Sequence, residues 1–103
     1  MNTTDLSFIV SELARVSRCV DFRHQRDLRS NATDVLEQLA LARVMIKTSG
    51  LKSIGALESL RAADKALDAL REDVDCLDSK LRRPVTDNID DAQDSVRSII
   101  SLA

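Results

Sequence analysis

The side chains best suited to nucleophilic chemistry in this sequence are two cysteines, Cys19 and Cys76, and a single histidine, His24. A catalytic thiol needs a base that accepts its proton and a third group that orients the base. Cys76 lies among three aspartates, and negative neighbours oppose the formation of a thiolate. Cys19 has arginines nearby, which favour a thiolate, but no glycine-rich elbow or orienting group accompanies it. We therefore expect both cysteines to be reduced and to lie in the core or an interface, with one long-range disulfide as the alternative. His24 is expected at the periphery of the core. We expect no enzymatic activity.

The residues that could hold a metal ion or a phosphate lack the surroundings that such sites need. Four aspartates lie on one side of the last expected helix, but no loop supplies the backbone carbonyls that a calcium site uses: Asp87, Asp90, Asp91 and Asp94. One histidine and two distant cysteines do not make a tetrahedral zinc site. The glycines of Gly50-Leu-Lys-Ser-Ile-Gly55 have the spacing of a phosphate loop, but Ala56 and Leu57 follow where that motif requires Lys and then Ser or Thr. We expect no metal and no cofactor.

Residues 42–60 could also form a helix-turn-helix, because Gly50 lies between two helical patterns. Its second helix would begin with Ser53-Ile-Gly-Ala-Leu-Glu58, which offers no early Arg, Asn or Gln to read base edges. A plain turn between two helices is therefore expected.

The most informative pattern lies on one side of the first expected helix, residues 5–28. At 100° per residue four arginines, Arg15, Arg18, Arg26 and the adjoining Arg29, fall within roughly 80° of arc, opposite an aliphatic stripe, and both phenylalanines of the chain share that side. Arginine and aromatic side chains are common in binding hot spots, and a guanidinium over a ring adds a cation–π attraction. The predicted partner-binding surface is this Arg/Phe face, which comprises Phe8, Arg15, Arg18, Phe22, Arg26 and Arg29. The alternative is a central helix whose arginines pair with the acidic second half of the chain.

Apolar residues recur at helical spacing along the chain. Cap residues at 30, 31 and 33 predict a break over residues 27–34, although one uninterrupted helix is possible because no Gly or Pro precedes residue 50. A second helix is expected over 34–47, and its stretch Leu39–Ile46 is apolar on nearly every side, which is typical of a helix buried between neighbours. Gly50 should end it.

A third helix is expected over residues 53–82 because a heptad seam of apolar residues runs along it: Leu60, Ala63, Leu67, Leu70, Val74, Leu77 and Leu81. Beyond Pro84 the seam continues with one extra residue of phase: Val85, Ile89, Ala92, Val96, Ile99 and Ala103. The last helix either folds back after Arg83 or continues through a kink at Pro84.

The composition agrees with helices. Two Gly and one Pro in 103 residues are too few turn residues for a β-sandwich or barrel, while 44% hydrophobic residues are enough for a core. A net charge of −2 does not favour broad attraction to nucleic acid or anionic lipid. No basic region followed by an apolar run opens the sequence, and no segment approaches about 18 apolar residues. We expect a cytoplasmic protein that has no membrane association.

Together these patterns predict an all-α fold, a small antiparallel bundle of three to four helices in a single domain, residues 1–103, with a coiled-coil-like seam in the C-terminal half. The predicted function is a non-enzymatic protein–protein interaction module, an adaptor, regulator or inhibitor of a larger assembly, which binds another protein through the Arg/Phe face. Because the seam is long for so short a chain, we expect a second copy to complete part of it in a homodimer. A nucleic-acid-binding regulator that uses the same basic face is the alternative.

Overall fold

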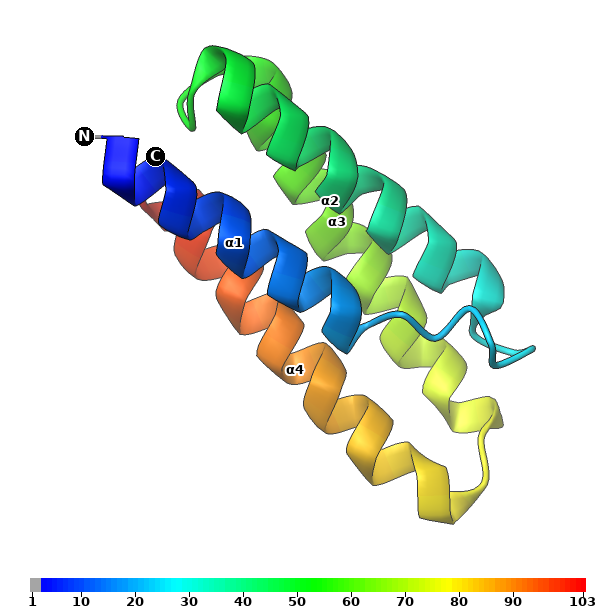
Figure 1. Cartoon of the computed structure of the whole chain (residues 1–103). Helices are drawn as coiled ribbons and strands as arrows, with labels where there is room; N and C mark the ends of the chain where they lie inside the picture. The colour runs from blue at the N-terminus through cyan, green and yellow to red at the C-terminus, as the bar shows by residue number, and fades with distance from the viewer. Residues whose placement is uncertain (1–2) are drawn as a thin grey trace.

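The computed structural model describes residues 3–103, and their side chains from Leu6 onward. It contains α1 (Thr3–Cys19), α2 (Arg29–Ser49), α3 (Ile54–Asp73), a short 3-10 turn η1 (Val74–Cys76) and α4 (Ser79–Ser101). Successive helices run in opposite directions, so both chain ends and the α2–α3 turn lie at one end of the bundle (Figure 1). The described residues form no strand. The predicted all-α antiparallel bundle is confirmed.

Each helix contributes one apolar side to a single core, and the bundle is about 44 Å long and about 20 Å across. Each helix packs against two neighbours, in the cyclic order α1, α2, α3, α4, and the most extensive contact joins α2 to α3. Among the fully buried side chains are Leu13 and Val16 of α1, Leu39 and Ile46 of α2, Leu60 and Leu67 of α3, and Ile89 and Val96 of α4. In the part of the chain that the structure describes, no helix is long and apolar enough to cross a membrane.

The first helix is shorter than its apolar spacing predicts. It ends at Cys19 rather than near residue 28, and a loop of residues 20–28 leads into α2. Val20, Phe22 and Leu28 are buried, so these apolar side chains close the end of the core from a loop rather than from a helix face. Backbone bonds such as Gln25 N–H to the Phe22 carbonyl, at 2.9 Å, form the turns of that loop. The predicted break exists, but it lies several residues earlier.

The turn between α2 and α3 follows the sequence pattern. Gly50 has φ of +87°, a conformation that is strained for residues with a side chain, and its N–H donates to the Ile46 carbonyl at 3.0 Å. Ser53 precedes α3, and its hydroxyl oxygen accepts the Ala56 N–H at 3.2 Å. The glycine stop and the third helix's start are confirmed.

The chain does not reverse at Pro84. Both predicted alternatives, a turn after Arg83 and a long kinked helix, are wrong because α3 ends at Asp73 and α4 begins at Ser79. Pro84 lies inside α4, where its missing N–H leaves the carbonyl of Lys80 without a helical partner. Both residues are exposed, so water can hydrate that carbonyl.

The reversal takes place at Leu77 and Asp78 instead. The Leu77 side chain is buried, and its N–H donates to the Val74 carbonyl at 2.9 Å. Arg82 reaches back across the turn, where its Nε donates to the Leu77 carbonyl at 2.9 Å and its Nη2 to the Asp75 carbonyl at 3.3 Å. A buried anchor and a charged donor therefore hold the turn seven residues before the proline.

The heptad seam is completed within one chain. All its members are buried in the common core except for Leu81 and Ala103, which are exposed. Because the chain reverses within the seam, its two halves face one another instead of forming one long stripe. An incomplete seam, the stated reason for a homodimer, is therefore not present.

Candidate functional site

The Arg/Phe face does not exist as one surface. Phe22 follows the end of α1, and its side chain is only 6% exposed because it packs into the core. Arg26 lies in the loop of residues 20–28, and Arg29 is the first residue of α2. The expectation that these residues share one helix face is wrong because the helix does not continue far enough to align them.

Arg15 is held in a polar network that joins α1 to α4. Its guanidinium donates to Glu12 at 2.6 Å, to Asp91 at 2.8 Å and to the Ser95 hydroxyl at 2.9 Å. The hydrogen bond from Arg15 lowers the pKa of Glu12, and the two carboxylates raise the pKa of Arg15 above its already high value. For Arg15 the alternative reading, pairing with the acidic second half, is confirmed.

Phe8 and Arg18 are both exposed, but they border different sides of α1. Phe8, 68% exposed, borders a hollow of about 320 Å³ between α1 and α4 that Leu102 also lines. Arg18 borders a pocket on the α2 side. The predicted face is therefore divided between two flanks of the helix.

The two cysteines are free and lie in different surroundings. Cys19 is half-buried, and burial together with the negative charge of Asp91 raises the pKa of its thiol, which disfavours the reactive thiolate. Cys76 is exposed, contrary to the core position considered for it, and lines a pocket of about 470 Å³ with His24. No hydrogen bond joins Cys76 to His24 among the described residues.

Within residues that the structure describes, no three His, Cys, Asp or Glu side chains are placed to hold a metal ion. The α4 aspartates are exposed, but Asp90 pairs with Arg71 and Asp91 with Arg15. The acidic face of α4 therefore serves partly as an ion-pairing surface toward α3 and α1.

Sequence reasoning missed an apolar surface on α2, which was expected to be buried on every side. Leu41 is 50% and Val44 59% exposed, and Met45 is also exposed. Leu41 follows the buried Leu39 by two positions, and Val44 follows the buried Ala42 by two positions. Each exposed residue therefore lies about 160° around the helix from that buried neighbour. The signal was present in the sequence as an all-round apolar helix, but the pattern alone does not say how many neighbours that helix has.

This apolar surface extends onto α3. The Met45 side chain lies across Gly55, where a Cβ would meet its Cε at 3.1 Å. Ile54, the residue before this glycine, is 75% exposed. We define the outer ridge as Leu41, Val44 and Met45 of α2 together with Ile54 of α3.

Charged side chains of opposite sign lie at the two ends of the outer ridge. Asp34 and Glu37 precede its α2 residues, whereas Lys47 and Lys52 follow them. All four are exposed, and none forms an ion pair within 4.0 Å with a side chain that the structure describes. The ridge is thus apolar at its centre, acidic at one end and basic at the other.

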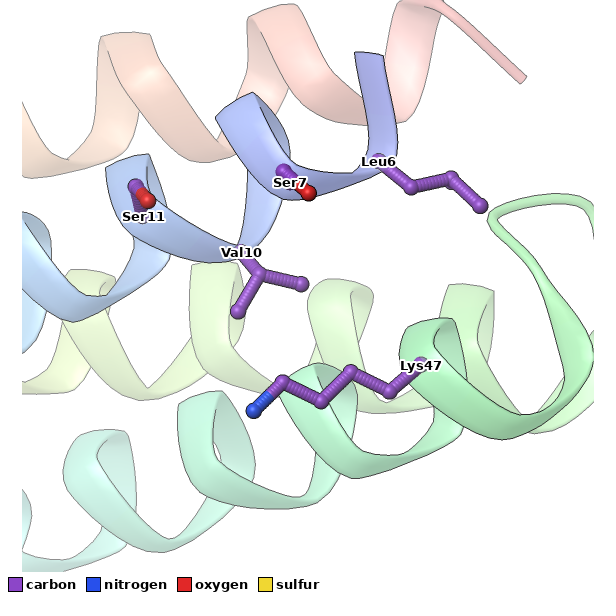
Figure 2. Close-up of a pocket in the computed structure, with 5 residues that line it drawn as sticks. All are labelled: Leu6, Ser7, Val10, Ser11 and Lys47. Atoms are coloured by element: carbon purple, nitrogen blue, oxygen red, sulfur yellow. The ribbon is translucent and has the colours of Figure 1, made fainter. Parts of the chain in front are cut away.

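Another concave region lies between α1 and α2, on the flank of α2 away from α3. Val10 projects from α1 toward α2 and Leu6 toward the α2–α3 turn, with Ser7 and Ser11 on the same helix, and the Lys47 side chain extends along the opposite wall (Figure 2). The hollow has a volume of about 360 Å³. Farther along α1, a pocket of about 250 Å³, here called the arginine pocket, is lined by Ser17, Arg18, Asp21, Arg23, Leu36 and Arg43.

No known protein family, no curated protein and no solved structure matches this chain.

Proposed function

We propose that this chain is a non-enzymatic protein–protein interaction module and that the outer ridge is its docking surface. The observation that carries the proposal is the row of exposed apolar side chains on a helix whose other side is fully packed. Apolar groups that gather on one face, rather than scatter singly, mark interaction surfaces in soluble proteins. Charged groups around such a centre set the orientation of the partner more than the affinity.

The occupant that fits this surface is a second copy of the chain, packed antiparallel through α2. Symmetric dimers place one patch against itself, so the patch must be self-complementary. A twofold axis that passes between two copies of α2, perpendicular to them and level with the midpoint between Leu41 and Val44, pairs Leu41 with Val44 of the second copy. The same axis sets Glu37 level with Lys47 of the second copy, because both lie about 7–8 Å along the helix from that axis. The long Lys47 side chain, which borders the hollow between α1 and α2, has to turn toward the ridge to form this pair.

Residues farther from the axis repeat this match. Asp34 lies roughly 13 Å along α2 from the axis on the acidic side, and Lys52 lies beyond the end of α2 on the basic side, so the acidic end of each copy faces the basic end of the other. A parallel arrangement would instead place like charges together. The distribution of charge therefore supports an antiparallel homodimer. This dimer differs from the one that the heptad seam predicted, because it uses α2.

Sedimentation analysis tests the proposal on the full chain. We expect the wild type to dimerise at about 100 µM, a concentration that detects even weak association. Leu41→Gln with Val44→Gln should be monomeric, whereas the matched control, Leu81→Gln with Leu102→Gln, removes two other exposed apolar side chains and should remain dimeric. A monomeric wild type, or a ridge variant that dimerises like the control, would refute the assignment.

A charge exchange tests the orientation. Glu37→Lys alone should weaken the dimer, and Glu37→Lys combined with Lys47→Glu should restore it, because the exchange recreates the pair across the twofold axis. Equal weakening by the single and double variants would contradict antiparallel packing. The nucleic-acid alternative relied on four arginines on one helix face, which the fold separates, and nothing in the outer ridge favours it.

A further inference from the structure

We propose that the arginine pocket is an anion-binding site that takes a phosphate group. The pocket lies where the last turn of α1, the loop of residues 20–28 and the middle of α2 meet. It is on the α1 side of α2, whereas the outer ridge is on the opposite flank. The proposal is therefore independent of the proposed dimer.

The balance of charge in the pocket is strongly positive. Three guanidinium groups, those of Arg18, Arg23 and Arg43, line it together with one carboxylate, that of Asp21. Both oxygens of Asp21 accept hydrogen bonds from Arg23, at 2.8 and 3.0 Å, and this contact lowers the pKa of Asp21. Asp21 is thus engaged by Arg23, and two guanidinium charges remain unbalanced.

Among the described side chains, Arg18 and Arg43 lack the ion pairs that other arginines of the bundle form between helices. Arg15, Arg71 and Arg97 each form an ion pair with an aspartate on a neighbouring helix. Within the described residues, neither Arg18 nor Arg43 has a carboxylate within 4.0 Å. Converging cations without an internal counter-ion attract a ligand anion, since each guanidinium can donate two parallel hydrogen bonds to it.

Arg43 supplies a second observation. Its Nε is buried and has no hydrogen-bond partner among the residues that the structure describes. An unpaired buried donor costs free energy, more so when it is charged. An anion in the pocket would allow the guanidinium to turn and satisfy this donor.

The loop that forms one wall of the pocket is anchored. Phe22, between Asp21 and Arg23, is buried in the core, so the two residues on either side of it have defined positions. Arg29 donates from its Nε to the Arg23 carbonyl at 3.0 Å, which joins the loop to the start of α2. A volume of about 250 Å³ accommodates a phosphate group with room for water. A dianion matches the two unbalanced guanidinium charges better than a single carboxylate does.

The test is a titration of the full chain with inorganic phosphate, followed by backbone amide NMR shifts against sodium chloride at matched ionic strength. We expect saturable shifts at residues 17–23 and 36–43. Arg43→Gln should bind about tenfold more weakly, the loss expected for a charged hydrogen bond. The matched control is Arg61→Gln, which removes the same charge from an exposed position on α3 and should bind as the wild type does.

Three results would overturn the proposal: no saturable shift with phosphate, equal loss of binding in Arg43→Gln and Arg61→Gln, or acetate binding as tightly as phosphate. If Arg43→Gln fails to fold, Arg18→Gln provides the same comparison from the exposed wall of the pocket. A blocked phosphoserine distinguishes the source of the group. Tighter binding than inorganic phosphate would support a site for a phosphorylated side chain, and weaker binding a site for the free ion.

Discussion

The stability of the Phe22→Ala variant is where the structure and the helical spacing of the sequence give the most different expectations. On a continuous helix Phe22 would be a surface anchor like Phe8, and its truncation would leave the fold intact. In the structure its ring is in the core and only 6% exposed, whereas Phe8 is 68% exposed. The two phenylalanines therefore form a matched pair, with the same side chain and the same substitution but opposite burial.

The expected loss of stability follows from this burial. A buried phenylalanine removes roughly 150–200 Å² from water, which at about 25 cal/mol per Å² is close to 4 kcal/mol. Alanine retains part of that, and a cavity adds a penalty, so Phe22→Ala should lower the free energy of unfolding by about 3 kcal/mol. For a chain of this size that lowers the midpoint of thermal unfolding by roughly 15 °C.

Urea and thermal unfolding followed by circular dichroism measure both variants. Phe8→Ala should remain within about 0.5 kcal/mol of the wild type, as exposed substitutions usually do. If Phe22→Ala were as stable as Phe8→Ala, the placement of the loop of residues 20–28 would be wrong. The positions of Asp21 and Arg23 in the arginine pocket would then also have to be abandoned.

Three further results are expected. Folding lowers the pKa of Glu12, so the ionised side chain contributes to the free energy of unfolding fully above its unfolded pKa near 4.5, and this contribution is lost as pH falls through the folded pKa. Glu12→Gln should therefore make the free energy of unfolding fall less steeply with decreasing pH, as urea unfolding between about pH 5 and pH 3 would measure. Pro84→Ala should stabilise the chain by about 1 kcal/mol or more, because it restores a bond to the Lys80 carbonyl inside α4; a loss in thermal stability would mean that the proline terminates a helix after all. Under native conditions a thiol reagent should modify exposed Cys76 well before half-buried Cys19, whose pKa is raised, and equal rates measured by mass spectrometry would contradict the contacts of Cys19 with α4.

Local patterns predicted the fold class well. The periodic apolar residues of all four helices, the stop at Gly50 and the start after Ser53 depend on backbone geometry within a few residues of each position. These features are short-range, so a single sequence contains them. The scarcity of Gly and Pro excluded β architectures for the same reason.

The predicted binding surface failed because it depended on where a helix ends. Val20 and Leu28 have the spacing of a helix face, yet both are buried from a loop. Periodicity cannot distinguish these cases, because the choice depends on how loop residues fill the end of a core built by other helices. The predicted turn or kink at Pro84 was wrong for a related reason, because an exposed helix tolerates a proline when water can reach the freed carbonyl.

The sequence by itself determined that this protein is helical, where most helical segments lie and that Leu39–Ile46 of α2 is apolar on nearly every side. Only the tertiary structure decided which side of α2 is packed, because that depends on how many helices surround it. It also decided which arginines meet a carboxylate, since Arg15 finds Asp91 from a distant segment whereas Arg18 and Arg43 converge without one. Burial and charge pairing are properties of neighbours in space. The outer ridge and the arginine pocket therefore emerge only when the chain is folded.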